Sequence, residues 1–141
     1  VKQIYGAERW LRSATNVIRA DGSAGLALPE PSRRQVHRIA VALGSSGSAP
    51  IYMGDFGRGF VHVLTEDSLG TILTELDTVE DLMSYLAAKE VLLRDDTRLL
   101  HASENDLLAT YLVAGQRLVG DADLVVLEDG LWEHVTGNDC G

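Results

Sequence analysis

The stretch LTELDTVEDLMSYLAAKE, residues 73–90, decides how the fold of this chain is interpreted, because it crowds four carboxylates into seven positions. These are Glu75, Asp77, Glu80 and Asp81. Apolar residues then recur at offsets of 3, 4, 7 and 14 from the first, at Val79, Leu82, Met83, Leu86 and Leu93. This spacing is typical of the buried face of a helix and predicts a helix over 79–93.

The acidic residues fit the start of that helix. Either Asp77 with Glu80, or Thr78 with Asp81, has the spacing of a capping box, in which each side chain accepts a backbone N–H of the first turn. Negative charge there also opposes the positive end of the helix dipole, and Lys89 has the favourable sign near the other end. The pattern therefore predicts a capped helix rather than an acidic active site.

The rest of the chain alternates between helical and extended patterns. We expect helices over 1–18, 68–76 and 103–114, the last with a Ser103–Asp106 capping box and Gly115 as its stop. We expect strands over 36–43, on both sides of the glycine-rich turn GDFGRGF (54–60), and in a hairpin over 122–135 that turns at Asp129-Gly130.

These elements predict an α+β fold in which about four helices pack on a small antiparallel sheet. The chain is interpreted as one domain over 1–141, with a helix and linker over 1–32 and an α+β body over 33–141. Leu82, Leu86 and Leu108 are predicted core positions, where alanine would cost several kcal/mol.

Composition limits the class of protein. The 141 residues are 45% apolar with a mean hydropathy of +0.03, values typical of a globular chain. No apolar run approaches the ~18 residues that a membrane span needs, and Cys140 has no second cysteine to pair with. We therefore predict a cytoplasmic location. The first residue, Val1, and the unpatterned end TGNDCG favour a fragment of a longer protein.

Charge divides the sequence into two parts. The net charge of −9 comprises +4 over residues 1–50 and −13 over 51–141. The acidic part disfavours nucleic acid, whereas the basic part is compatible with a DNA contact. Arg33, Arg34 and Arg38 form the densest basic cluster. They are either a solvated strand end or a phosphate-binding site, because arginine forks match phosphate oxygens.

No motif indicates catalysis. Asp55-Phe56-Gly57 matches the magnesium-binding tripeptide of protein kinases, but the other kinase motifs are absent and the glycines suit a turn between strands. The histidines at 37, 62, 101 and 134 show no local zinc-site spacing. We therefore assign no catalytic residue, no metal ligand and no cofactor from spacing alone.

Several segments together resemble a family. KQIYGAERWL, VHRIAVALG, GFVHVL, LDTVEDLMSYLAAKE, HASENDLLATYL and GLWEHV are similar to the later part of uncharacterised bacterial proteins, some of which carry an upstream nuclease-like domain of the restriction-endonuclease type. Such nucleases hold magnesium with an Asp and a later Glu-x-Lys. This chain has no Glu-x-Lys, so the resemblance implies that any magnesium ligands lie before Val1.

Two main functions remain open, beside a third in which the acidic residues form a small-molecule enzyme with a polar pocket of carboxylates. The first is a non-catalytic accessory or interaction segment of a larger bacterial protein, whose partner is another protein or the remainder of its own parent chain. The alternative is a part of a metal-dependent nuclease that uses magnesium bound upstream.

Overall fold

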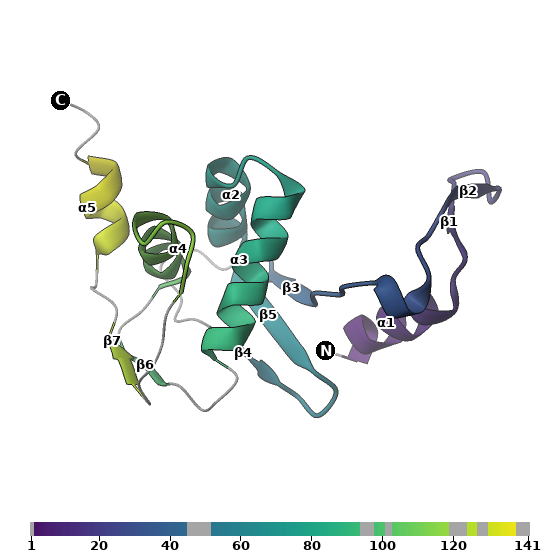
Figure 1. The fold of residues 1–141 in the computed structure, drawn as a ribbon, viewed down its shortest axis with the longest axis horizontal. Helices are drawn as coiled ribbons and strands as arrows, with labels where there is room; N and C mark the ends of the chain where they lie inside the picture. The colour runs from purple at the N-terminus through teal and green to yellow at the C-terminus, as the bar shows by residue number, and fades with distance from the viewer. Residues whose placement is uncertain are drawn as a thin grey trace.

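The computed structural model describes residues 2–44, 52–93, 98–100, 103–118, 124–126 and 130–137. Within these residues the α+β class predicted from the sequence is confirmed. A central body holds a three-stranded sheet and its helices, and an N-terminal segment extends from one end of that body (Figure 1). None of the described helices combines the length and the apolar character required to cross a bilayer.

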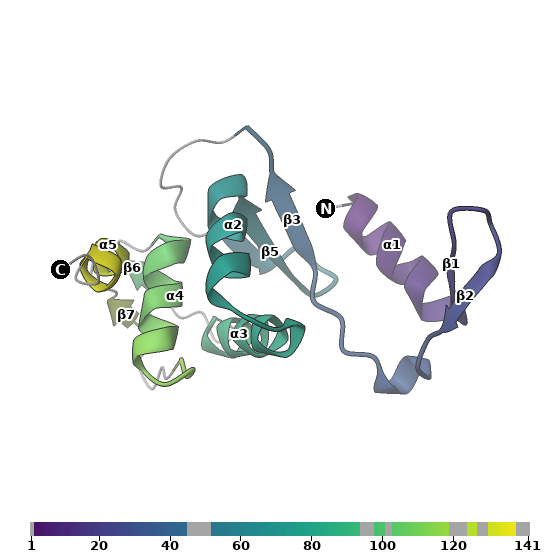
Figure 2. The ribbon, with the colours of Figure 1, turned by 90° about the horizontal axis from the view of Figure 1, so that it is seen from above.

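The N-terminal segment, residues 2–34, is named the arm. It contains helix α1 (Lys2–Ser13), strands β1 (Asn16–Ile18) and β2 (Ala24–Ala27), and the short 3-10 helix η1 (Pro31–Arg33). The two strands pair antiparallel and form a hairpin that projects away from the body in both ribbon views (Figures 1 and 2). The predicted helix over 1–18 is thus too long, since residues 16–18 pair in the hairpin and do not continue the helix.

The central sheet has the order β3-β5-β4, from β3 (Ile39–Ala42), β5 (Phe60–Thr65) and β4 (Tyr52–Asp55). Strands β4 and β5 form the antiparallel hairpin expected around the glycine-rich turn. Strand β3 runs parallel to β5, with Ile39 opposite His62. The sheet is therefore mixed, and the prediction of a purely antiparallel sheet is wrong for the β3–β5 pair.

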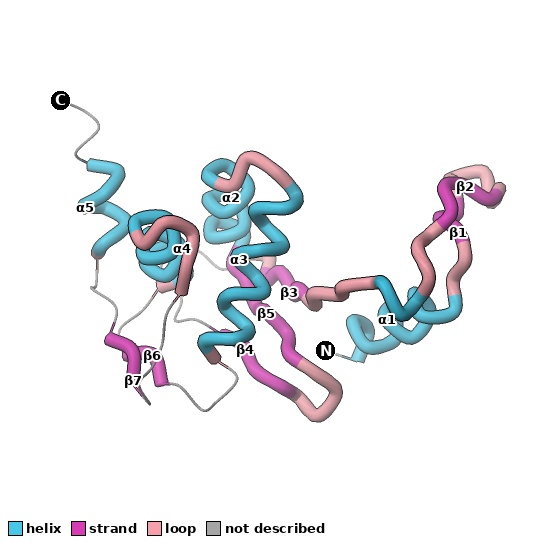
Figure 3. The backbone as a smooth tube through the Cα atoms, in the orientation of Figure 1, coloured by secondary structure: helices cyan, strands magenta, loops and turns pink. Residues whose placement is uncertain are grey.

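The next three helices along the chain pack on this sheet and on one another (Figure 3). Each of them begins with a side-chain cap. Helix α2 (Glu66–Glu75) begins after Thr65, whose hydroxyl accepts the N–H of Ser68. Helix α3 (Val79–Leu92) begins with a complete capping box between Thr78 and Asp81. Of the two pairs considered for the acidic stretch, the structure contains this one. Asp81 caps a helix, as predicted.

Helix α4 (Glu104–Val113) begins with the predicted Ser103–Asp106 capping box. The second carboxylate oxygen of Asp106 accepts the N–H of Trp132, 3.1 Å away, at the start of helix α5 (Leu131–Gly137). One carboxylate thus serves two helix starts. The predicted hairpin over 122–135 is wrong, because residues 131–137 are helical and strand β7 (Leu124–Val126) pairs in parallel with β6 (Arg98–Leu100).

The core lies where α2, α3 and α4 meet the sheet. Its buried cluster consists of Leu64, Ile72, Leu76, Tyr85, Leu86, Leu108 and Tyr111. Leu86 and Leu108 are fully buried as predicted, and Leu82 packs against the cluster while partly exposed. The rings of Tyr85 and Tyr111 meet edge-on at 5.1 Å between centroids, an arrangement that aromatic pairs favour.

Candidate functional site

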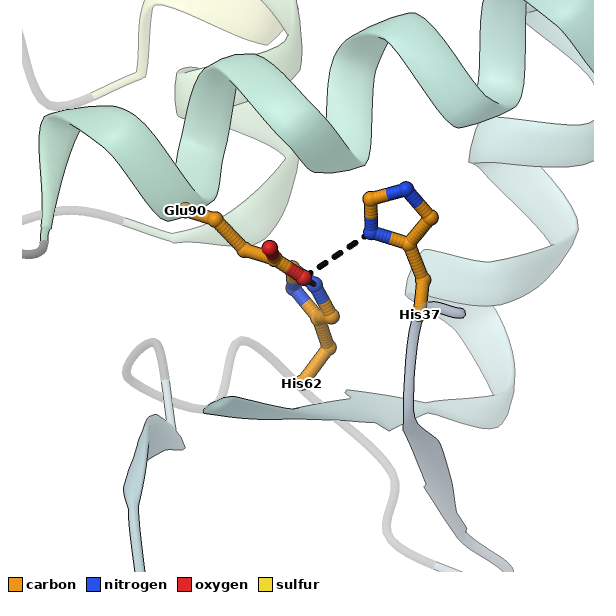
Figure 4. Close-up of side chains that lie close together, drawn as sticks. All are labelled: His37, His62 and Glu90. Carbon is orange, nitrogen blue, oxygen red and sulfur yellow. Dashed lines mark hydrogen bonds and ion pairs between the residues drawn. The ribbon is translucent and has the colours of Figure 1, made fainter. Parts of the chain in front are cut away.

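A buried polar cluster lies between the sheet and α3, formed by His37, His62 and Glu90 (Figure 4). The oxygen Oε1 of Glu90 lies 2.9 Å from Nδ1 of His37 and 3.0 Å from Nε2 of His62. The side chain of His37 is 4% exposed and that of His62 is fully buried, whereas that of Glu90 is 19% exposed. The carboxylate therefore forms the side of the cluster that solvent can reach.

Three elements place these side chains. His62 lies in the middle of β5, and its N–H donates to the carbonyl of Arg38 at 2.8 Å across the parallel ladder. His37 lies two residues before β3. The parallel pairing of β3 with β5 therefore brings His37 beside His62, with 6.3 Å between the ring centroids. Glu90 extends from α3 toward both rings (Figure 4).

The hydrogen bonds define a consistent set of protons. An ionised Glu90 only accepts, so both facing ring nitrogens carry hydrogen. Nε2 of His37 then accepts from the side-chain amide of Gln35, at 3.0 Å. Nδ1 of His62 is a buried acceptor with no partner among the described residues. Burial, and next the positive charge of Lys89, lower the pKa of His62, although Glu90 opposes them. His62 is therefore neutral at pH 7.

A second buried network lies one residue along α3. Nζ of Lys89 bonds both carboxylate oxygens of Glu104 on α4, and the Tyr85 hydroxyl donates to the same carboxylate at 2.8 Å. Lys89 is fully buried, and burial lowers its pKa against the opposing effect of Glu104. Burial, and then the charge of Glu104, raise the pKa of Tyr85 well above 10. Lys89 lies in the last turn of α3, where its charge has the favourable sign for the helix dipole, as the sequence indicated, and it also joins α3 to α4 in the core.

The first cluster has the composition of a metal site. One ligand atom from each of its three residues lies within 4.8 Å of the other two. Imidazole nitrogens and carboxylate oxygens are ligands for zinc and related ions. Sequence spacing does not reveal the cluster, because Glu90 lies 53 and 28 positions from the two histidines. Of the other histidines, His134 is exposed on α5 and His101 lies outside the described residues.

The three arginines predicted to contact nucleic acid have different environments. Arg34 donates to the carbonyls of Pro29, Leu11 and Ala14, so it covers the C-terminal end of α1. Arg38 forms two bonds of 2.7 Å to the carboxylate of Glu8. Arg33 is exposed at the end of η1.

Arg34 thus holds segments of the arm together, whereas Arg38 attaches the arm to the rest of the chain. Nucleic-acid binding by the three remains a prediction. The Arg38 guanidinium, with help from Arg12, lowers the pKa of Glu8 to about 2. Arg38 also lies over the Tyr5 ring, with 5.9 Å from its Cζ to the centroid. Tyr5 in turn donates to the carbonyl of Gly59, so these contacts connect α1 to the turn before β5.

The Asp55-Phe56-Gly57 tripeptide has the structural role expected from the sequence. Oδ1 of Asp55 accepts the N–H groups of Gly57 and Gly59 and closes the turn between β4 and β5. Gly57 and Gly59 have φ values of 94° and 104°, which favour glycine. A Cβ on Gly59 would lie 2.7 Å from the Arg38 guanidinium. This turn is part of the attachment of the arm.

The arm buries little of itself. Over residues 2–34 only Tyr5 is buried, and large apolar side chains remain exposed at Trp10, Val17, Ile18 and Leu26. Between α1 and residues 36–39 lies an open groove of about 390 Å³, lined in part by Ile4, Trp10, Leu11 and Val36. This groove and the hairpin are thus apolar surfaces of the arm that remain open in the structure.

No protein-family model matches the chain. Neither a curated protein nor a solved structure matches it. The site is therefore interpreted from its own geometry.

Proposed function

We propose that this chain is a non-catalytic interaction domain of a larger bacterial protein, and that the arm is the part that binds a protein surface. The observation that carries the proposal is the burial of Tyr5 alone among residues 2–34. A two-stranded hairpin without further packing is only marginally stable in water, so the arm gains stability when another surface covers it.

The chemistry of the arm indicates what that surface offers. Trp10, 52% exposed, stands at the groove, and Leu26, 80% exposed, stands on the hairpin. Residues 2–34 carry six Lys/Arg against three Asp/Glu. Tryptophan and arginine are the side chains that most often dominate binding energy at protein interfaces. The partner surface, on another protein or on the remainder of the parent chain, is therefore apolar at its centre and acidic at its rim.

Site-specific photo-crosslinking in cells tests this assignment. A benzophenone amino acid at position 10 is compared with the same residue at position 113 on α4, where Val113 is also well exposed. The proposal requires one protein that crosslinks at position 10 and not at 113. After purification, that protein must bind the Trp10→Ala variant and the Leu26→Ser variant at least about tenfold more weakly than it binds the unchanged chain. A tenfold change in Kd is equivalent to about 1.4 kcal/mol of binding free energy. Equal affinities for all three chains would reject it.

Incubating the chain alone with DNA and magnesium tests the nuclease alternative. Cleavage that EDTA abolishes would show that this segment is catalytic and would overturn the first proposal. DNA binding weakened by substituting Arg33, without any protein crosslink at position 10, would make the arm a nucleic-acid contact instead.

A further inference from the structure

We propose that His37, His62 and Glu90 bind one divalent transition-metal ion, and that zinc fits their chemistry best. Two neutral imidazoles and one carboxylate form a ligand set that zinc uses with three protein ligands and a water molecule. Calcium and magnesium prefer sets made of oxygen, which disfavours them here.

The distances suit such an ion after a small adjustment. Zinc bonds of about 2.0–2.1 Å at tetrahedral angles separate neighbouring ligand atoms by about 3.3 Å. The two distances from Oε1 of Glu90 are 2.9 and 3.0 Å. The two Glu90 distances therefore need to lengthen by a few tenths of an ångström, and the two ring nitrogens, which lie within 4.8 Å of each other, need to stand at about the same 3.3 Å. Glu90 is the most exposed of the three side chains and is therefore the one with most room to move.

The scaffold holds the ligands in place. His62 lies within β5 and Glu90 within α3, so regular secondary structure fixes both backbones. The Gln35 amide lies 3.0 Å from Nε2 of His37 and orients that ring with Nδ1 toward Glu90. With metal on Nδ1, Nε2 carries the hydrogen, and a flip of the Gln35 amide presents its oxygen as acceptor.

The remaining ring nitrogen sets a limit on affinity. Nδ1 of His62 has no partner among the described residues, whereas metal-binding histidines usually donate from that second nitrogen. Loss of such a partner typically weakens metal binding by about 10–100-fold. We therefore expect a site weaker than a fully supported zinc centre. With three protein ligands, the fourth position is left for water on the side of Glu90.

Calorimetric titration of the full chain with zinc chloride, after removal of metal by EDTA and dialysis, tests the proposal. The titration uses a Cys140→Ser background, so that the thiol contributes no ligand. We expect one zinc per chain. Glu90→Gln keeps the shape of the side chain, and His37→Gln changes a ring at the edge of the cluster. Each should weaken binding at least about tenfold. His134→Gln, an exposed histidine on α5, is the matched control and should bind as the background chain does.

Cobalt provides a second readout that does not depend on the heat of binding. Cobalt bound by two imidazoles and a carboxylate in a four- or five-coordinate site gives intense visible absorption bands. These bands should appear with the control variant and be lost with Glu90→Gln. Circular dichroism establishes that each variant remains folded, so that lost binding is not lost structure.

Two results would overturn the inference. The first is zinc binding of equal strength in the background chain, Glu90→Gln and His37→Gln, which would place the ion elsewhere. The second is the absence of binding to the background chain at zinc concentrations up to about 100 µM, a Kd that corresponds to a binding free energy of about −5.5 kcal/mol. In that case the three residues are a hydrogen-bonded cluster only.

Discussion

Replacing Lys89 by methionine tests how the core tolerates its buried charges. Methionine fills the space of the lysine stem but leaves the Glu104 carboxylate, whose residue is 4% exposed, without its cation. Removing one partner of a buried ion pair typically costs about 3–5 kcal/mol. Tyr85 still donates to the carboxylate and offsets a part of that loss.

Proton uptake sets an upper limit on the electrostatic cost. A carboxyl group with an ordinary pKa near 4.3 can be protonated at pH 7 for about 3.7 kcal/mol, from 1.36 kcal/mol per pH unit. At pH 5 the same step costs about 1 kcal/mol. We therefore expect Lys89→Met to lower the free energy of unfolding by about 3–4 kcal/mol at pH 7 and by clearly less at pH 5.

Urea unfolding of four chains measures the coupling between the two side chains. These are the unchanged chain, Lys89→Met, Glu104→Gln and the double variant. Because the double variant leaves no charge uncompensated, its loss should be smaller than the sum of the two single losses by at least about 2 kcal/mol. Additive losses, or a Lys89→Met cost that is the same at pH 5 and pH 7, would refute the reasoning.

Three further predictions concern the caps and the attachment of the arm. Ser103→Ala removes one half of the α4 capping box and should cost about 1 kcal/mol in urea unfolding; an unchanged midpoint would contradict that role. Gly57→Ala should lower the free energy of unfolding by about 1 kcal/mol, because the residue has a positive φ. Gly59→Ala should lower it further, because the added Cβ also meets the Arg38 guanidinium. Equal losses of stability in the two variants would show that Arg38 moves aside freely. In a carboxyl NMR titration Glu8 should titrate near its pKa of about 2. Because this folded pKa is lowered, the stability that the Glu8–Arg38 pair contributes is fully present above about pH 4.5 and is lost as the pH falls through about 2. The Arg38→Met variant should return the titration midpoint of Glu8 toward 4.5.

Local sequence signals predicted the parts of the fold that local contacts determine. The Thr78–Asp81 and Ser103–Asp106 boxes each span four consecutive residues, so their patterns contain the whole interaction. The glycines of the β4–β5 turn are equally local. The Ser103–Asp106 box and the glycine turn are confirmed, and of the two boxes considered at the start of α3 the structure contains Thr78–Asp81.

The errors come from interactions between distant segments. The Asp129-Gly130 pair favoured a hairpin turn, but the Asp106 carboxylate accepts the Trp132 N–H at the start of a helix there. The candidate site could not be found from spacing, because His37, His62 and Glu90 meet only through the β3–β5 pairing and the packing of α3. For His62, the sequence offered one signal, which was its place beside the apolar run of a predicted strand.

The parallel pairing of β3 with β5 has a consequence for the order in which the chain folds. The β4–β5 hairpin begins from residues five positions apart, Asp55 and Phe60, whereas Ile39 and His62 are 23 apart. Closing the longer loop costs roughly 1.4 kcal/mol more in chain entropy, so the hairpin forms early and β3 joins it late. His37 lies two residues before β3, so we expect the histidine–glutamate cluster to assemble only after the β4–β5 hairpin has formed.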